Sequence, residues 1–194
     1  MGIDSPRIEA AVAELLAAIG EDPARPALAD TPRRVAEAYG EFFAGIGQDP
    51  LEHLRDAKEI EAGAGELGEL VLLRDVDFRS ICEHHLLPFI GVAHLAYAPG
   101  KRIVGLGRLP RVVETLSSRP QLQERLGEQI ADAIDTGLSP RGVLVVLDAR
   151  HGCVTARGTR QVDSTTVTVA SRGTLSEPAA QSAVLATIAR GVDR

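Results

Sequence analysis

The chain has 194 residues, 44% of them apolar, which favours one compact domain with a substantial core and room for an appendage. Its formal net charge of −6 gives no support to a nucleic-acid-binding role. Two cysteines are too few for a small secreted disulfide scaffold, and neither a signal-peptide pattern nor an apolar run of about 18 residues is present. We therefore expect a soluble cytoplasmic protein with no nucleic-acid and no membrane partner.

Helical periodicity dominates the first part of the chain. Apolar residues recur at helical spacing over residues 8–19. A second helix is expected over residues 30–46, where Pro32 suits the first turn. Residues 1–56 are accordingly predicted to form an N-terminal helical appendage. The polar, glycine-rich stretch 57–69 is predicted to be a linker.

From residue 70 onward the pattern changes to strands grouped around a pair of helices. Leu70, Leu72, Val76 and Phe78 share one parity, which predicts a strand with a single buried face. The other predicted elements are strands at 88–99, 142–153 and 164–171, two helices within 110–138 separated near Arg119-Pro120, and a short helix at 179–189.

The order of these elements is β-β-α-α-β-β over residues 70–194, which indicates an α+β fold. We expect an antiparallel sheet with helices on one face, preceded by the N-terminal helical pair. A four-stranded sheet of this kind has two open edges. Because open edges tend to pair with other strands, assembly of several copies of the chain is expected.

The stretch SICEHHLLPF, residues 80–89, concentrates metal-binding side chains. Cys82 and His85 are three residues apart, and within one helical turn such residues lie on the same side. A second group, His151-Gly152-Cys153, ends the third predicted strand, where residues two apart share a face. Two thiolates and one imidazole suit zinc, and three protein ligands leave a fourth position for water.

Spacing alone leaves other interpretations open. The two cysteines could be ordinary buried residues or could form a disulfide. His84 or His151 could supply a fourth ligand and close the site. His94, in the middle of a strand, reads as a structural histidine and His53 as a surface one.

Several motifs taken together resemble the GTP cyclohydrolase I family. They are CEHHLLPF, LPRVVE, RPQLQERL and HGCVTARG, in this order, and the similarity runs from DTPRRVAEAYGEFFAGIGQDP to STTVTV, most of the chain. The resemblance implies the tunnelling fold, built from β-β-α-α-β-β subunits that assemble into a toroidal homodecamer with active sites at subunit interfaces. It also implies zinc as the metal ion.

The resemblance further assigns roles to individual residues. Cys82, His85 and Cys153 correspond to the zinc ligands, and His84 and His151 to the catalytic histidines. Zinc-activated water could attack C8 of the guanine ring, and a histidine could protonate the ring nitrogen as C8 leaves as formate.

A carboxylate and a set of arginines complete the implied site. Glu124 corresponds to the carboxylate that binds the N–H groups of guanine; without the resemblance it would read as a solvated helix residue. The family's reaction continues by rearrangement and ring closure to 7,8-dihydroneopterin triphosphate. The phosphate-binding residues it implies are Arg34, Arg108, Arg111 and Arg157.

Three positions depart from the family pattern in the phosphate-binding set. Gly107 stands where the family has serine, Arg108 where it has lysine, and Glu37 where it has a basic residue. A glutamate would repel a triphosphate, unless it pairs with Arg33 or Arg34 on its own helix.

These departures leave several functions to compare. First is GTP cyclohydrolase activity. Second is a paralogue that acts on a guanine nucleotide with fewer phosphates, and third is one that stops at a ring-opened product. Outside this activity we consider a non-catalytic zinc-binding homologue, a redox protein with a Cys82–Cys153 disulfide, and a nitrile reductase of the same fold, which would lack the CEHH cluster.

Overall fold

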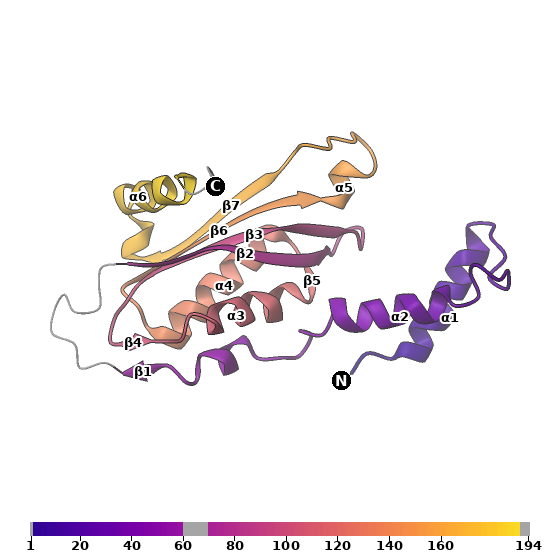
Figure 1. Ribbon diagram of the computed structural model, residues 1–194, viewed down its shortest axis with the longest axis horizontal. Helices are drawn as coiled ribbons and strands as arrows, with labels where there is room; N and C mark the ends of the chain where they lie inside the picture. Colours follow the sequence, from indigo (N-terminus) through magenta and orange to yellow (C-terminus); the bar gives the residue numbers. More distant parts are fainter. Residues whose placement is uncertain (1, 60–69, 191–194) are drawn as a thin grey trace.

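Two helices extend from one end of a sheet-and-helix body in the computed structural model of the protein (Figure 1). The structure describes residues 2–59 and 70–190. Helix α1 spans Ser5–Ala18, with the Asp4 carboxylate accepting a hydrogen bond from the Arg7 amide at 3.2 Å, and α2 spans Thr31–Phe42 with Pro32 in its first turn. No residue of α1 is buried, so this helix contributes little to the core of a single chain.

The centre of the body is a five-stranded sheet. Its strand order is β5-β2-β3-β6-β7, antiparallel throughout except for the parallel pairing of β5 with β2. Two further short strands, β1 and β4, pair with each other. The strands span β1 Lys58–Glu59, β2 Val71–Cys82, β3 Pro88–Ala98, β4 Arg102–Ile103, β5 Pro120–Gln121, β6 Gly142–His151 and β7 Thr166–Gly173.

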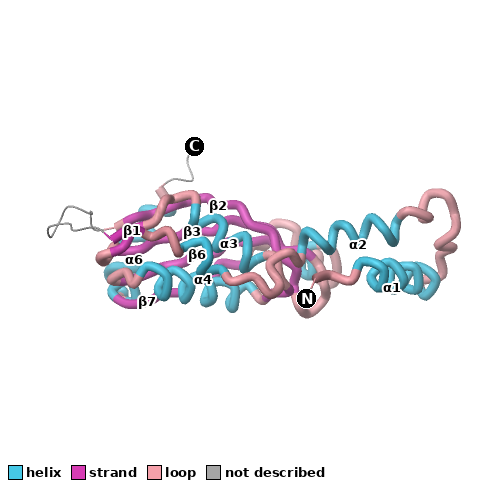
Figure 2. The backbone as a smooth tube through the Cα atoms, turned by 90° about the horizontal axis from the view of Figure 1, so that it is seen from below, coloured by secondary structure: helices cyan, strands magenta, loops and turns pink. Residues whose placement is uncertain are grey.

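Helices cover both faces of this sheet. Helices α3 and α4 pack side by side on one face, and α6 lies on the opposite face (Figures 1 and 2). The arrangement confirms the predicted α+β class and the expected helix pair, and it adds α6 as a partial cover for the second face. Besides α1 and α2, the helices are α3 Arg108–Ser117, α4 Gln123–Leu138, α5 Gly152–Thr155 and α6 Pro178–Ala189, and the 3₁₀ helices are η1 Pro50–Leu54 and η2 Thr174–Ser176.

The main core lies between the sheet and the α3–α4 pair. Leu126, Ile130 and Ile134 recur along one face of α4 and are completely buried against the sheet. Burying each such side chain contributes about 1.5–3 kcal/mol. Strand β6 runs through the middle of the sheet and is buried from Gly142 to Leu147, because helices cover it on both sides. Its carboxyl end, which carries His151, therefore projects from a rigid strand.

The expectation of one buried face along the first strand is wrong. A β-bulge between Leu73 and Val76, with Asp75 at a φ of 57°, reverses the side-chain alternation within β2. Leu72 packs toward α6, whereas Leu73 and Val76 pack into the main core. A bulge inserts an extra residue, so the side chains after it point to the opposite face from the one that regular alternation along the sequence predicts.

The predicted division at residues 56 and 69 remains a prediction, and the packing next to it is informative. Leu54 in η1 is 1% exposed, and a Cβ placed on Gly137 of α4 would come within 2.4 Å of Leu54 Cδ1. His53 Nε2 lies 2.8 Å from Thr115 Oγ1 of α3, so this histidine is half-buried rather than free on the surface. Of the predicted linker, Lys58–Glu59 forms β1, and residues 60–69 lie outside the described residues.

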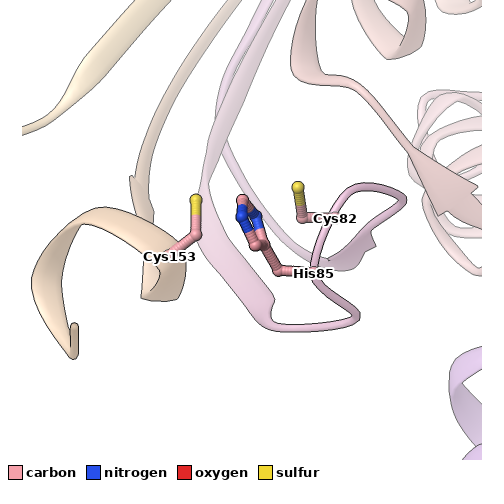
Figure 3. Close-up of side chains that lie close together, drawn as sticks. All are labelled: Cys82, His85 and Cys153. Carbon is pink, nitrogen blue, oxygen red and sulfur yellow. The ribbon is translucent and has the colours of Figure 1, made fainter. Parts of the chain in front are cut away.

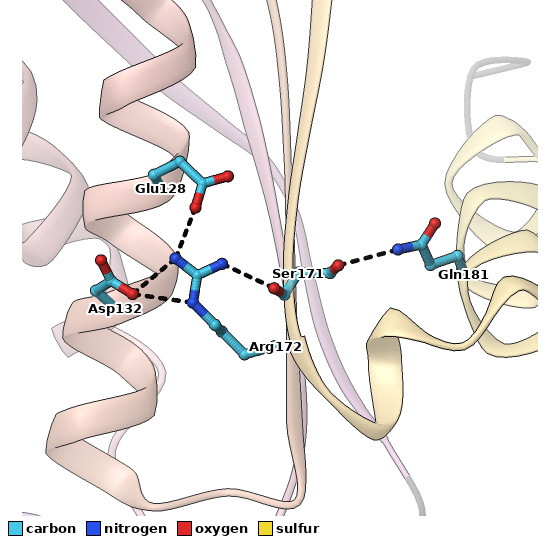
Figure 4. A network of polar contacts seen from close by, with 5 residues as sticks. All are labelled: Glu128, Asp132, Ser171, Arg172 and Gln181. Atoms are coloured by element: carbon cyan, nitrogen blue, oxygen red, sulfur yellow. Dashed lines mark hydrogen bonds and ion pairs between the residues drawn. The ribbon is translucent and has the colours of Figure 1, made fainter.

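An arginine network ties β7 to α4. Arg172 donates to Glu128 at 2.6 Å and to Asp132 at 2.7 and 2.9 Å (Figure 4). On the neighbouring residue, the Ser171 hydroxyl accepts a hydrogen bond from Gln181 of α6 at 3.0 Å. Consecutive residues of β7 thus connect helices on opposite sides of the sheet. Over residues 2–59 and 70–190, no helix is both long and apolar enough to cross a membrane.

Candidate metal centre and active site

The residues 82–86, here called the CEHHL turn, connect β2 to β3. The Leu86 amide donates to the Cys82 carbonyl at 2.9 Å, and the Cys82 amide donates to the Leu87 carbonyl at 2.9 Å. The first of these bonds closes a single helical turn, which is the geometry expected from the three-residue spacing of Cys82 and His85. Leu86 closes the turn at a φ of 51°, in the left-handed region.

Cys153 reaches the same place from another element than predicted. The third strand was expected to run through residue 153, but β6 ends at His151 and Cys153 lies in the short helix α5. A Cβ added to Gly152 would lie 2.9 Å from the Pro88 carbonyl oxygen. Glycine at this position therefore lets the start of α5 approach the start of β3 closely, which carries Cys153 toward the CEHHL turn.

Cys82, His85 and Cys153 converge on one point (Figure 3). Their ligand atoms all lie within 4.8 Å of one another, in a group that could bind a metal ion. Donors about 2.0–2.3 Å from a common ion lie within about 4.6 Å of each other, so small side-chain shifts suffice for ligation. Both cysteines are free thiols in the structure.

The surroundings of Cys153 disfavour its thiolate form in the metal-free protein. Burial raises the pKa of Cys153, and the neighbouring Cys82 raises it further. Arg157 acts in the opposite direction but more weakly. Because metal ligation requires thiolates, a bound cation would supply the positive charge that the protein provides only weakly here.

His151 is held on two sides. Its ring stacks on Phe89 with centroids 4.7 Å apart and planes 2° apart, and its Nε2 lies 2.7 Å from Gln123 Oε1. Burial lowers the pKa of His151, and the nearby carboxylate of Glu124 partly opposes that shift. The imidazole is therefore biased toward its neutral form beside the thiol group.

The first turn of α4 carries side chains toward this end of the sheet. Glu124 is exposed there and close enough to His151 to affect its pKa. Arg125 donates to the carboxylate of Glu83 in the CEHHL turn at 2.6 and 3.3 Å. Glu83 has no role assigned from the sequence, and in the structure it links the turn to α4. His84 is exposed on the same turn.

The four arginines that were expected to bind phosphates come from separate parts of the chain, in α2, in α3 and just after α5. Arg34 of α2 lies 3.5 Å from the carboxylate of Asp30, the residue just before this helix, and Arg108 pairs with Asp56. Arg111 and Arg157 are exposed, and of the two it is Arg157 that lies near enough to Cys153 to affect its pKa.

Glu37 is paired on its own helix, as one of the two alternatives expected. Its carboxylate accepts a hydrogen bond from Arg33 at 2.6 Å, and this contact raises the pKa of Arg33. The glutamate is therefore neutralised locally rather than presented as a lone negative charge. Arg33 is correspondingly engaged by an acidic neighbour.

Arg108 and the CEHHL turn lie at opposite ends of α3. Arg108 begins this ten-residue helix, which is about 15 Å long, and the helix ends beside β5, which pairs with Ile81 and Cys82. A hollow of about 790 Å³ between α2, β2 and α3 is lined by side chains including Arg79 and Glu114, and by none of the predicted site residues. One chain therefore brings the candidate metal ligands close to His84 and His151 but leaves Arg108 apart.

Two residues of the site were missed at the sequence level. Gln123 and Phe89 hold His151, and both are almost fully buried. The position of Gln123 could have been recognised from the sequence, because it shares the apolar face of α4 with Leu126 and Ile130. A side-chain amide on such a face needs hydrogen-bond partners inside the protein. Phe89 had no signal, because its contact with His151 depends on the pairing of β3 with β6.

Comparison with known proteins identifies the family. The family model described as GTP cyclohydrolase I matches residues 8–189. GTP cyclohydrolase 1 of Leifsonia xyli is 61% identical over 190 residues, covering 98% of both chains. The Carboxydothermus hydrogenoformans protein of that name is 54% identical, covering 88% of this chain and 87% of its own, and the Rhodopirellula baltica one is 48% identical, covering 97% and 80%.

A solved structure, the archaeosine synthase QueF-Like in the apo form, matches with a TM-score of 0.43 and 16% identity over 54% of this chain and 94% of that one, a likeness too weak to add to these matches. The family model covers most of the chain, and the relatives are 48–61% identical to it over at least 88% of its length. The chain therefore belongs to the GTP cyclohydrolase I family.

Proposed function

We propose that this protein opens the guanine imidazole ring of GTP hydrolytically with release of formate, and then rearranges and cyclises the product to 7,8-dihydroneopterin triphosphate. The observation that carries the proposal is the convergence of Cys82, His85 and Cys153 beside a histidine that two buried side chains hold in place. Relatives named GTP cyclohydrolase 1, up to 61% identical over nearly the whole chain, support the same activity.

Zinc is the proposed metal ion, held by Cys82, His85 and Cys153. Two thiolates and an imidazole suit this ion better than the hard cations, which prefer oxygen ligands. A zinc ion held by these three residues would leave a position for water and would lower the pKa of that water, which would supply hydroxide near neutral pH. The exposure of His85 leaves the group open to solvent and to a substrate.

His84 and His151 are the proposed acid–base groups. Ring opening at C8 requires a proton on the departing ring nitrogen, and an imidazole that is neutral near pH 7 can carry that proton in either direction. Glu124 is the proposed guanine-binding residue. Its exposed carboxylate can accept two hydrogen bonds from the N–H groups on the Watson–Crick edge of guanine, a pair that adenine does not offer.

Arg34, Arg108, Arg111 and Arg157 are the proposed phosphate contacts. Guanidinium groups bind phosphate oxygens in a fork, and each of these four is at least partly exposed. In Arg34 and Arg108 the guanidinium pairs with an aspartate in the free chain. The triphosphate would therefore displace Asp30 and Asp56 from these two residues.

We also propose a cytoplasmic homo-oligomer, a decamer with active sites at subunit interfaces. The separation of Arg108 from the CEHHL turn along α3 supports this, since a second copy could supply the arginines that one chain does not place near its own metal-binding group. The exposed apolar side chains of Leu15 in α1 and of Ile19, directly after this helix, are further surface for such an assembly.

A nucleotide panel tests the proposed function. The zinc-loaded protein is incubated with GTP, GDP, GMP and 2′-deoxy-GTP, and formate and product masses are measured. We expect formate and a dihydropterin triphosphate from GTP. Preference for GDP or GMP would assign a substrate with fewer phosphates, and a formamidopyrimidine product would assign a reaction that stops at ring opening. Loss of all activity with a full complement of zinc would indicate a non-catalytic homologue.

A further inference from the structure

The buried side chain of Gln123 has its orientation fixed by hydrogen bonding. It is 1% exposed, and its amide nitrogen Nε2 lies 2.8 Å from the Thr166 carbonyl, 3.1 Å from the Leu147 carbonyl and 3.2 Å from the Thr168 hydroxyl. Carbonyl oxygens accept but never donate, so the amide NH₂ must face them. A flipped amide would place Oε1 against two carbonyl oxygens and would turn the NH₂ group away from all three of these acceptors.

This orientation dictates where His151 carries its proton. Gln123 Oε1 faces His151 Nε2 at 2.7 Å and can only accept a hydrogen bond. Nε2 must therefore carry a proton in both the neutral and the charged imidazole. In the neutral ring Nδ1 has the free lone pair. Stacking on Phe89, with planes 2° apart, opposes rotation of the ring about its Cβ–Cγ bond and so keeps Nε2 directed at Gln123.

We infer that Gln123 is a positioning residue that fixes His151 as the Nε2–H tautomer, so that Nδ1 is the ring atom that gives and takes the proton during ring opening. The inference rests on the proposed function for its catalytic part only, because the tautomer follows from the hydrogen bonds alone. It places the support for one proton-transferring residue on α4, next to the proposed guanine-binding residue Glu124.

Solid-state NMR of the zinc-loaded assembly labelled with ¹⁵N-histidine tests the tautomer directly. The chain has five histidines, and the His151 signals are assigned by their loss in His151→Asn. We expect a protonated Nε2 and an unprotonated Nδ1 for neutral His151 in the wild-type protein. A neutral ring protonated on Nδ1, or an equal mixture of the two tautomers, would overturn the inference without any variant of Gln123.

Gln123→Leu tests the positioning role, with Gln121→Leu as its matched control. Gln121 is 2% exposed and donates to the Leu116 carbonyl and the Gln129 side chain, but it does not contact His151. We expect Gln123→Leu to give mixed His151 tautomers and to lower kcat for formate release by roughly 100-fold, with little change in KM for GTP. Gln121→Leu should keep both the single tautomer and kcat.

Gln123→Glu covers the case in which the leucine variant does not fold. A glutamate keeps an acceptor toward His151 Nε2, so the Nε2–H signal should persist and kcat should exceed that of Gln123→Leu or, if that variant is unfolded, that of His151→Asn. Wild-type kcat in a variant whose tautomer is mixed would contradict the positioning role. If the wild-type protein releases no formate from any guanine nucleotide, the proposed function fails, while the spectrum still decides the tautomer.

Discussion

Two regions of this protein are built in different ways: the candidate metal-binding end and the set of four arginines proposed to contact phosphates. Around Cys82, Cys153 and His151 each side chain is fixed by neighbours of the same chain: a closed turn, a glycine contact, a ring stack and a buried amide. Arg34 and Arg108 instead lie on exposed helix starts and pair with aspartates. The region proposed to bind metal and break bonds is preorganised, whereas the region proposed to hold phosphates is not.

The difference indicates where sequence changes can be tolerated. A ligand set with atoms within 4.8 Å of one another leaves no room for substitution. Exposed arginines can be replaced or rearranged because a guanidinium reaches phosphate from several positions. The departures expected from the family pattern, at Glu37, Gly107 and Arg108, all lie in or beside the proposed phosphate-binding residues.

Removing one ligand should have the largest effect. Cys153→Ala leaves two donors, so we expect loss of bound zinc and at least a 1000-fold loss of formate release, equivalent to about 4 kcal/mol of transition-state stabilisation. Elemental analysis and a formate assay measure both quantities. Val154→Ala, the neighbouring change on α5, should retain the metal. Full activity in metal-free Cys153→Ala would contradict the metal-binding proposal.

Glu124→Gln tests base recognition beside the metal-binding end. An amide can accept only one of the two guanine hydrogen bonds, so kcat/KM for GTP should fall by roughly 5- to 150-fold, equivalent to about 1–3 kcal/mol. Steady-state kinetics provide the measurement. Glu128→Gln on the same helix, which weakens the Arg172 network, should lower stability but leave kcat/KM near wild type (Figure 4). Equal losses in both variants would argue against a specific role for Glu124.

The double change Gly107→Ser with Arg108→Lys probes the arginine set. We expect GTP turnover to rise, by as much as about 100-fold if the hydroxyl stabilises the rearrangement. Position 107 tolerates the serine, because a Cβ there meets no heavy atom within 4 Å and the backbone is in the right-handed helical region. Gly105→Ser, equally unhindered, should leave turnover unchanged. A fall in GTP turnover would mean that these positions serve another substrate.

Glu37→Gln should have a smaller effect. It releases Arg33 from its 2.6 Å ion pair and removes a negative charge from the proposed phosphate region. We expect kcat/KM to rise by roughly twofold for GTP and to stay constant for GMP, since exposed charge pairs are weak. The unfolding midpoint should barely change. An equal gain for both nucleotides would place Glu37 away from the triphosphate.

The smallest expected effect is on folding stability and comes from His94, which is buried in the sheet, unlike the exposed arginines. Burial lowers the pKa of His94 below 6.5; Asp75 and Asp148 oppose this, and Arg74 adds to it. His94 therefore binds a proton more readily in the unfolded chain than in the folded one. As a result, the free energy of unfolding declines as pH falls below 6.5, and it becomes constant below the folded-state pKa of His94.

Urea unfolding at several pH values measures this decline. His94→Gln should lose less stability between pH 7.5 and 5.5 than the wild type. An unchanged decline in His94→Gln would show that other groups cause it.

Much of the fold followed from periodicity, and the exceptions have physical causes. The pair of helices between the strands, the order of the main elements along the chain and the break at Pro120 were predictable because apolar spacing and proline act locally. The β2 bulge and the ending of β6 before Cys153 were not, because they depend on pairing with β3 and on the approach of Gly152 to Pro88. For the site, motif spacing anticipated the ligand group, but the contacts of His151 with Phe89 and Gln123 arise from tertiary packing.

The ratio of formate released to 7,8-dihydroneopterin triphosphate formed, measured with zinc-loaded protein and GTP, tests the central claim most directly. If both regions act as proposed, one molecule of formate accompanies each molecule of the pterin. Formate in excess over the pterin would show that the metal-binding end opens the ring while the arginine set fails to support the rearrangement. No formate from fully loaded protein would contradict the account at the residues where the structure supports it most strongly, Cys82, His85 and Cys153.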